Sequence, residues 1–260
     1  MQHDLTYATY LKTDELLALQ SPLSDEPEHD ETLFIVIHQV YELWFKQMLH
    51  EVSLLQNSLE SQERTLALKT MHRMLTILKT MVAQVDILET MTPLSFVSFR
   101  DRLKNSSGFQ SSQFRMFEVK LGKRDTRTFS NLADNYRIQI EEQLSKNTLW
   151  DSFLKHLSDC GIKISPTSLQ RDRNKAIEPD TALQETLIDI YKKHPDLAEI
   201  CERMVDLDEG LQEWRYRHVK MVERTIGVKM GTGGSPGAAY LKTTLFTPLY
   251  PDLWDIRSRF

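Results

Sequence analysis

The chain has 260 residues, of which 40% are hydrophobic, and its formal net charge is −5 at pH 7. This length is enough for a sizeable core, and the composition is that of a globular protein rather than a disordered one. The negative charge disfavours a nucleic-acid-binding protein, whose contact face would be basic. Two cysteines are too few for a disulfide framework or a cysteine metal cage, and both Cys160 and Cys201 are expected to be buried thiols.

Localisation signals are lacking in the sequence. No basic stretch followed by an apolar run marks a signal peptide, and the longest apolar runs are far too short to span a bilayer. We therefore expect a cytoplasmic protein without membrane contact. The basic cluster of Lys120, Lys123, Arg124 and Arg127 is expected to be solvated surface.

Helical periodicity dominates from the start of the chain, and no alternating strand pattern stands out. A first helical segment covers residues 6–19, and an acidic connector leads to a long helix over about 32–59. His38 lies on this helix, with Phe34 one turn before it and Glu42 one turn after it. Two interpretations remain open: a buried histidine held by a carboxylate, or a pocket wall that offers one polar atom among aromatic rings.

The next helix, over about residues 65–91, has a methionine-rich stripe that predicts core packing. Thr92 and Pro93 then predict a helix start, with the threonine as N-cap and the proline at the first position, and this helix is expected to end near Asn105. Arg100 lies on it. Its position alone favours a surface residue, and the alternative is a guanidinium fork that grips a carboxylate.

A polar break over residues 106–111 precedes a helix that starts near Gln113. Residues 125–151 are polar and weakly patterned, and a helix around Phe153 is closed by Gly161. The charged stretch 163–180 is the best candidate for a mobile loop or lid. A further helix covers 181–193.

The longest helical pattern runs from about Pro195 to Ile226 and carries His218 on an apolar stripe with Trp214. A histidine in such a place is more often a core residue with one hydrogen-bond partner. The alternative is an axial ligand of haem iron, because neutral imidazole on a rigid helix suits that role.

The helix stops at a loop, GTGGSPG, that spans residues 231–237. The loop lacks the Gly-Lys-Ser/Thr ending of a phosphate-binding loop and the strand that precedes a dinucleotide fingerprint. It is either a plain connector or a segment whose backbone amides approach a small ligand. Ser235 and Pro236 predict the N-cap and first position of a short helix, and the tail from Tyr240 is expected to pack as short pieces. The patterns together predict an all-α protein, whose length allows one large domain over residues 1–260 or two small ones.

Three stretches resemble the tryptophan 2,3-dioxygenase family, in the family's order: FIVIHQVYELWFKQMLHE (34–51), FRDRLKNSSGFQSSQFR (99–115), and residues 214–240 with the glycine loop. Tyr7 to Leu11 also match. The resemblance covers nearly the whole chain and is weakest between Leu121 and Asp196. It implies a bundle of long helices around a haem, and an enzyme that inserts both atoms of O2 across the indole C2–C3 bond of L-tryptophan to give N-formylkynurenine.

The resemblance also implies a role for individual residues. His218 would be the axial ligand of the haem iron, and His38 would accept a hydrogen bond from the indole N–H. Arg100 would pair with the substrate carboxylate, and Thr232 would contact the substrate's ammonium and carboxylate. The remaining implied contacts are two pocket walls, a segment beside the haem edge, and an N-terminal piece that reaches a neighbouring subunit: Phe34 and Phe99, Ser107 and Gly108, and Tyr7, Tyr10 and Leu11.

The implied assembly is a homotetramer, a dimer of dimers, in which residues 1–20 are exchanged between subunits. One haem b per subunit would be ferrous in the active form. Phe96 departs from family members that carry tyrosine there, so carboxylate binding would rest on Arg100 and Thr232. The alternatives are a dioxygenase of a modified indole, a haem sensor or carrier, and a helical scaffold without haem.

Overall fold

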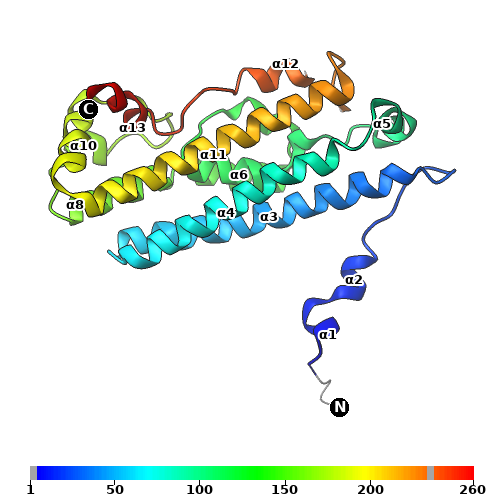
Figure 1. Ribbon diagram of the computed structural model, residues 1–260, viewed down its shortest axis with the longest axis horizontal. Coiled ribbons are helices and arrows are strands. Elements are labelled where there is room, and N and C mark those ends of the chain that lie inside the picture. Colours follow the sequence, from blue (N-terminus) through cyan, green and yellow to red (C-terminus); the bar gives the residue numbers. More distant parts are fainter. Residues whose placement is uncertain (1–4, 233–236) are drawn as a thin grey trace.

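The computed structural model describes residues 5–232 and 237–260, and every regular element in those ranges is helical. Three long helices run alongside one another (Figure 1): α3 (His29–Glu60), α4 (Arg64–Leu88) and α11 (Pro195–Ile226). The all-α prediction is confirmed, and α11 has the predicted bounds. None of the helices in the described ranges has both the length and the apolar character to cross a membrane.

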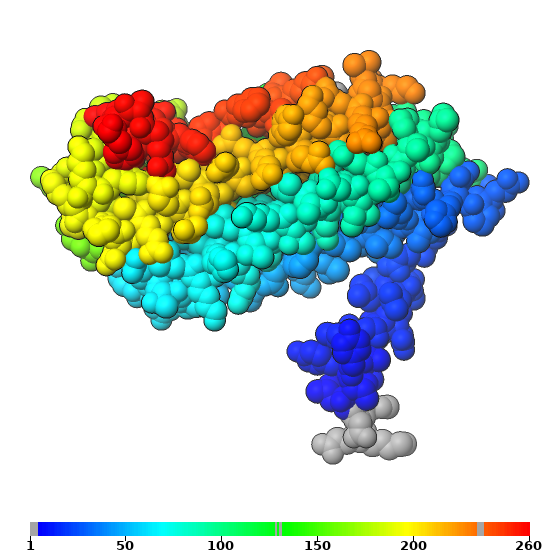
Figure 2. All heavy atoms as spheres, viewed as in Figure 1, coloured from blue at the N-terminus to red at the C-terminus, as the bar shows by residue number. Residues whose placement is uncertain are grey.

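The core includes the contacts of α4 with α3 and of α4 with α11. Met48 of α3, Met71 and Met74 of α4, and Met204 of α11 are each at most 1% exposed. The methionine-rich stripe of α4 is therefore core, as predicted, and each such side chain contributes roughly 1.5–3 kcal/mol through burial. Figure 2 shows the compact body that results.

Shorter helices close this core. They are α5 (Pro93–Arg100), η1 (Asp101–Leu103), η2 (Gly108–Gln110), α6 (Ser112–Leu121), η3 (Thr126–Asn131), α7 (Asp134–Leu144), α8 (Leu149–Asp159), α9 (Pro166–Leu169), α10 (Thr181–Lys193), α12 (Gly237–Lys242), α13 (Pro251–Asp255) and η5 (Ile256–Arg259). Thr92 caps α5 as predicted, because its side chain accepts from the Ser95 N–H. Helix α5 ends at Arg100, earlier than expected, and continues as η1.

Helix α7 has no counterpart in the predictions. Residues 125–151 showed little periodicity, and the structure gives the reason: Ile140 is the one buried residue described for α7. A helix that buries so little leaves almost no apolar stripe in the sequence. Helix α8 starts at Leu149, where Thr148 and Asp151 form a capping box.

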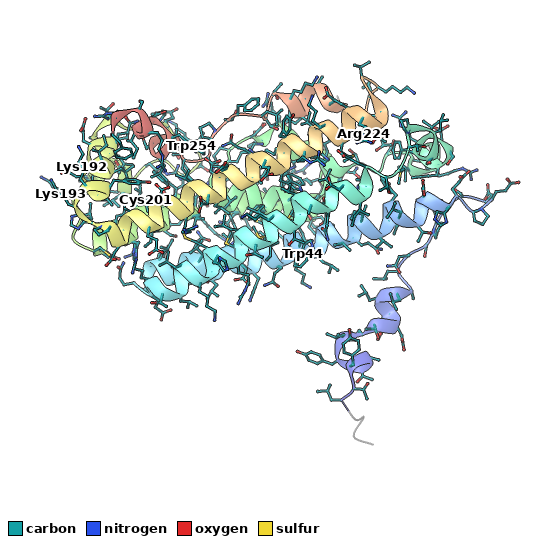
Figure 3. All side chains as sticks on the ribbon, in the orientation of Figure 1. Trp44, Lys192, Lys193, Cys201, Arg224 and Trp254 are labelled. Atoms are coloured by element: carbon teal, nitrogen blue, oxygen red, sulfur yellow. The ribbon has the colours of Figure 1, made fainter. Side chains whose placement is uncertain are left out.

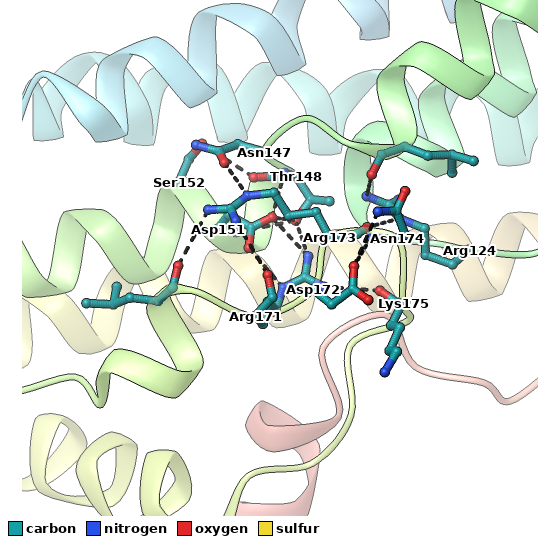
Figure 4. A network of polar contacts seen from close by, with 12 residues as sticks. Arg124, Asn147, Thr148, Asp151, Ser152, Arg171, Asp172, Arg173, Asn174 and Lys175 are labelled. Carbon is teal, nitrogen blue, oxygen red and sulfur yellow. Dashed lines mark hydrogen bonds and ion pairs between the residues drawn. The ribbon is translucent and has the colours of Figure 1, made fainter.

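The charged stretch 163–180 is tied to the body by a set of contacts that we call the α8 network (Figure 4). Arg171 donates from Nε and Nη2 to the Asp151 carboxylate, at 2.9 Å each. Arg173 donates to the Asn147 side chain at 2.7 Å, and Arg124 donates to the Arg173 carbonyl at 2.6 Å. The stretch includes the short helix α9 and is anchored by its arginines.

The N-terminal segment stands away from the body (Figure 1). It contains α1 (Tyr7–Leu11) and α2 (Thr13–Leu17), neither of which buries a residue. Tyr7 is 77% exposed and Tyr10 is 71% exposed. The side chains of Tyr7 and Tyr10 are therefore not packed against the described residues of their own chain.

Two expectations about side chains are wrong. Cys201, which Figure 3 labels on α11, is buried as expected. Cys160 is exposed, because it lies at the C-cap of α8, and its Sγ donates to the side chain of Gln62. The basic cluster is also not simply solvated. Arg124 donates to the carbonyls of Val119 and Leu144, so it caps the ends of α6 and α7.

Candidate functional site

A cavity of about 260 Å³ lies within the helical bundle and is bordered by α5 and α12. Helices α3, α4, α5, α6, α11 and α12 all contribute to its lining. One apolar part of the wall comes from the C-terminal end of α4 and the residues just after it, and another comes from α11; they comprise Val85, Leu88, Met91, Met221, Val222 and Ile226. Both predicted histidines, from helices far apart in sequence, line this one space.

His38 presents an acceptor nitrogen. Its Nδ1 lies 2.7 Å from the Phe34 carbonyl oxygen. Because a carbonyl only accepts, Nδ1 carries the proton and Nε2 keeps a lone pair. The ring is open to the cavity but surrounded by protein elsewhere, and this desolvation lowers the pKa of His38, against the opposing effects of the Phe34 hydrogen bond and Glu42. The imidazole is therefore neutral at pH 7.

His218 is the second imidazole. Desolvation, followed by the nearby His38 and Arg115, lowers its pKa to about 4. No described residue is within hydrogen-bonding geometry of its ring nitrogens, so the core-histidine interpretation with one satisfied partner does not hold. A neutral imidazole whose nitrogens are unpaired on a 32-residue helix has the properties of a metal ligand.

The orientation of His218 is fixed by Trp214. The two rings are parallel to within 1°, with centroids 5.3 Å apart. Trp214 is itself packed edge-on by Tyr41 and Phe45, and tilted against Phe114. The Tyr41 hydroxyl donates to the Met81 carbonyl at 2.8 Å. This packing restricts rotation of the indole, and the indole restricts rotation of the imidazole.

Phe34 packs beside His38, and two further phenylalanines pack against Phe34. The Phe34 ring centroid lies 4.1 Å from that of His38, and it also contacts Phe96 and Phe99 at 5.8 and 5.6 Å. Phe34 and Phe96 line the cavity. Phe99 is completely buried behind them and is not among the lining residues. It supports the aromatic wall instead of forming its surface.

Arg100 lies at the cavity with its charge unmatched. Its Nη2 donates to the Met230 carbonyl at 2.5 Å, and no carboxylate of the described chain forms an ion pair with it. Gly231 and Thr232 line the same region. A guanidinium held by a carbonyl still has donors in its fork for a ligand carboxylate.

The structure describes Gly231 and Thr232 at the start of the glycine loop and Gly237 at its end. Gly237 has φ +60°, and a Cβ there would lie 2.8 Å from the Lys229 carbonyl oxygen, so only glycine fits without distortion. The predicted N-cap at Ser235 and Pro236 lies outside the described residues. Thr232 and Gly237 both line the cavity, so the loop borders the site.

The other predicted site residues divide into two groups. Ser107 and Gly108 line the cavity, and the Ser107 hydroxyl accepts from the Phe109 N–H at 3.4 Å. Tyr7, Tyr10 and Leu11 lie on the exposed N-terminal segment and do not line the cavity of their own chain. None of the lining residues belongs to the stretch 163–180, so the position of that stretch gives a lid no support.

The sequence reasoning missed a charged part of the wall, which we call the α6 cluster: Arg115, Glu118, Lys123 and Arg215. All four line the cavity. The Glu118 carboxylate forms three ion pairs, with N···O distances of 2.5 Å to Arg115, 2.9 Å to Lys123 and 2.8 Å to Arg215. Burial acts to raise the pKa of Glu118, but the three cations hold it at about 2. The three-residue spacing of Arg115 and Glu118 was visible, but it did not indicate burial.

The sequence is similar to that of known proteins over nearly its whole length. The family model described as tryptophan 2,3-dioxygenase matches residues 1–159 and 168–260. A tryptophan 2,3-dioxygenase of Herpetosiphon aurantiacus is 54% identical over 261 residues, which cover 99% of this chain and 99% of the relative. Relatives of the same name from Anaeromyxobacter sp. (53%, covering 97% and 95%) and Caulobacter vibrioides (40%, covering 100% of both) are also similar. The chain belongs to the tryptophan 2,3-dioxygenase family.

Proposed function

We propose that this chain is a haem-dependent dioxygenase that inserts both atoms of O2 across the indole C2–C3 bond of L-tryptophan, giving N-formylkynurenine. The observation that carries the proposal is the pair of neutral imidazoles, His38 from α3 and His218 from α11, in one cavity that also holds the unmatched Arg100. This is the first step of tryptophan degradation by the kynurenine route.

The residues present fit a haem. His218 is neutral, unpaired within the described chain, and held by Trp214, as an axial ligand requires. The apolar residues of α4 and α11 suit the faces of a flat macrocycle. When bound, haem b supplies the iron on which O2 reacts, in the ferrous form and with one haem per subunit.

His38 would orient the substrate. Its Nε2 is the only ring nitrogen able to accept, because Nδ1 donates to Phe34. A single acceptor is enough to fix the direction of an indole N–H, and a neutral imidazole need not remove the proton. Phe34 and Phe96 would contact the flat indole and exclude water from it.

Arg100 and Thr232 would hold the zwitterionic part of tryptophan. Arg100 would bind the carboxylate through donors that its Met230 contact leaves available. Thr232 would contact the ammonium and carboxylate groups. The residue at position 96 is phenylalanine, which has no hydroxyl, so the carboxylate relies on these two side chains.

We also propose that residues 1–260 form one domain and that four such chains assemble as a dimer of dimers. The exposed side chains of Tyr7, Tyr10 and Leu11 support contact of residues 1–20 with a neighbouring subunit's cavity, where Ser107 and Gly108 border the haem edge. A cytoplasmic location stays a prediction.

The test is an anaerobic sample of the reduced, haem-loaded protein to which L-tryptophan and then air are added. The expected result is N-formylkynurenine, seen by its absorbance, with one O2 consumed per product. A haem-loaded protein that gives no product with L-tryptophan but turns over a substituted indole would reassign the substrate. No turnover with any indole would favour a sensor or carrier, and a protein that binds no haem would contradict the proposal.

A further inference from the structure

The α6 cluster carries more positive charge than its own carboxylate can match. Arg115, Lys123 and Arg215 each form their ion pair with Glu118, and no other carboxylate of the described chain pairs with them. The cluster therefore has an excess of two positive charges. Arg115, Glu118 and Arg215 are each at most 7% exposed.

One donor of the cluster is also left without a partner. The Nε of Arg115 is buried and makes no hydrogen bond within the described structure. A buried guanidinium donor that remains unpaired carries a desolvation cost, and so does an excess of buried charge. Both costs are removed if an anion with several oxygen acceptors occupies the adjacent cavity. The chemistry that matches the excess is a pair of carboxylates.

We infer that the α6 cluster binds the two propionate carboxylates of the haem. The inference rests on the proposed function, because it takes His218 as the iron ligand. Arg215 lies three residues before His218 on α11, which is about 4.5 Å along the helix axis. Arg115 and His218 line the same cavity, so a macrocycle bound at His218 extends beside this wall.

The substrate carboxylate is the other possible anion at this wall. Arg100 is the better site for it, because it lies on a different helix and has no carboxylate partner within the described chain. A single substrate carboxylate would also match only one of the two excess charges of the cluster, whereas the two propionates match both. The test must nevertheless distinguish the two sources.

The experiment compares haem with haem dimethyl ester, in which both propionates are neutral. Each form is loaded into the full-length protein, and its dissociation rate is measured by transfer to an excess of a haem-scavenging protein. We expect the ester to dissociate from the wild-type protein at least roughly tenfold faster, because charge-assisted hydrogen bonds to both carboxylates are lost. Both forms should show the same axial-ligand spectrum.

Arg115→Gln then tests the residues. In this variant the ratio between the two dissociation rates should fall toward one, because one partner of the propionates is already absent. The matched control is Arg203→Gln on the same helix as Arg215, since Arg203 forms a surface ion pair with Asp206, and here the ratio should stay at the wild-type value. If Arg115→Gln does not fold, Lys123→Gln takes its place in the same comparison, because Lys123 is the least buried cation of the cluster.

Equal dissociation rates for haem and its ester in the wild-type protein would overturn the inference while leaving the proposed function intact. A variant in which tryptophan binds more weakly while the ratio stays unchanged would assign the cluster to the substrate carboxylate and also overturn it. A protein that binds neither form would contradict the proposed function itself.

Discussion

Two regions of the molecule bury charged side chains, and only one of them pairs all of its buried hydrogen-bond donors. In the α8 network, the Asp151 carboxylate receives four donors, two from Thr148 and two from Arg171. The guanidinium groups of Arg124 and Arg173 donate to carbonyl and amide oxygens, so no buried donor of this network is left unpaired among the described residues. In the α6 cluster, one carboxylate meets three cations, and Arg115 keeps an unpaired donor. The region whose buried donors are all paired closes the fold, whereas the region with an unpaired donor faces a cavity.

The same contrast applies to the histidines. His156, on α8, has its Nδ1 3.0 Å from the Leu59 carbonyl oxygen and its Nε2 near Cys160. His218 has no comparable partner within the described residues. A group that is satisfied by its own chain stabilises the fold, and a group that is left unsatisfied in a cavity indicates a ligand.

The largest expected effect follows from His218→Ala. Removal of the axial ligand should abolish normal haem loading and, with it, turnover, because no other described histidine besides His38 lines the cavity. The absorption spectrum of the purified variant, prepared with added haem, measures this. The matched control is His72→Ala on the exposed face of α4, which should load normally. An unchanged haem spectrum in His218→Ala would remove this residue from the ligand role.

Arg171→Met should act on stability alone. It leaves the buried Asp151 carboxylate without its cation, which costs about 3–5 kcal/mol of unfolding free energy. Denaturant unfolding measures the loss, and haem content per folded chain should not change. Loss of haem from the folded variant would mean that the α8 network is coupled to the site.

Glu118→Gln should change the dependence of stability on pH. The folded pKa of about 2 lies below the unfolded value of 4.5, so the charged carboxylate stabilises the fold above pH 4.5 and loses this contribution as the pH falls toward 2. The contribution is about 3 kcal/mol. The wild-type and variant unfolding free energies should therefore converge across this window, while other titrating groups affect both alike. A constant difference between the two proteins would contradict the assignment.

Arg100→Met should lower kcat/KM for L-tryptophan by about 100-fold, because a charge-assisted bidentate contact is lost. Tryptamine, which lacks the carboxylate, is the matched comparison. The variant should lose most of the wild-type preference for tryptophan over tryptamine. A preference that survives the substitution would place the carboxylate elsewhere.

His38→Ala should have the smallest effect on catalysis. If His38 only orients the indole N–H, the rate should fall by about tenfold, the cost of one hydrogen bond, and some product should still form. Steady-state turnover of the haem-loaded variant measures this. A complete absence of product would indicate that His38 does more than orient the substrate.

The sequence predicted what depends on local periodicity. Helix α11 has 32 residues of regular apolar spacing, so its bounds and the position of His218 followed directly. Thr92 as N-cap and Pro93 as first residue likewise predicted the start of α5. That His38 and His218 line one cavity depends on tertiary packing, and the sequence indicated a shared site only through the family resemblance.

The parts that were missed depend on burial of polar residues. Lys123 and Arg124 are indistinguishable from solvated residues in the sequence, because what buries them is the packing of other helices. Cys160 was expected to be buried, but the end of α8 leaves it exposed. Phe99 and Phe96 share a short helix, and only the packing shows which of the two reaches the cavity.

The central claim is that the cavity places L-tryptophan beside a haem so that both oxygen atoms of one O2 enter the substrate. The most direct measurement is a turnover of the reduced, haem-loaded protein under ¹⁸O₂, with the product analysed by mass spectrometry. The account predicts N-formylkynurenine that carries two ¹⁸O atoms, after allowance for exchange of the formyl oxygen with water. A product with one oxygen from water before any exchange, or no oxidised product from a haem-loaded protein, would contradict it.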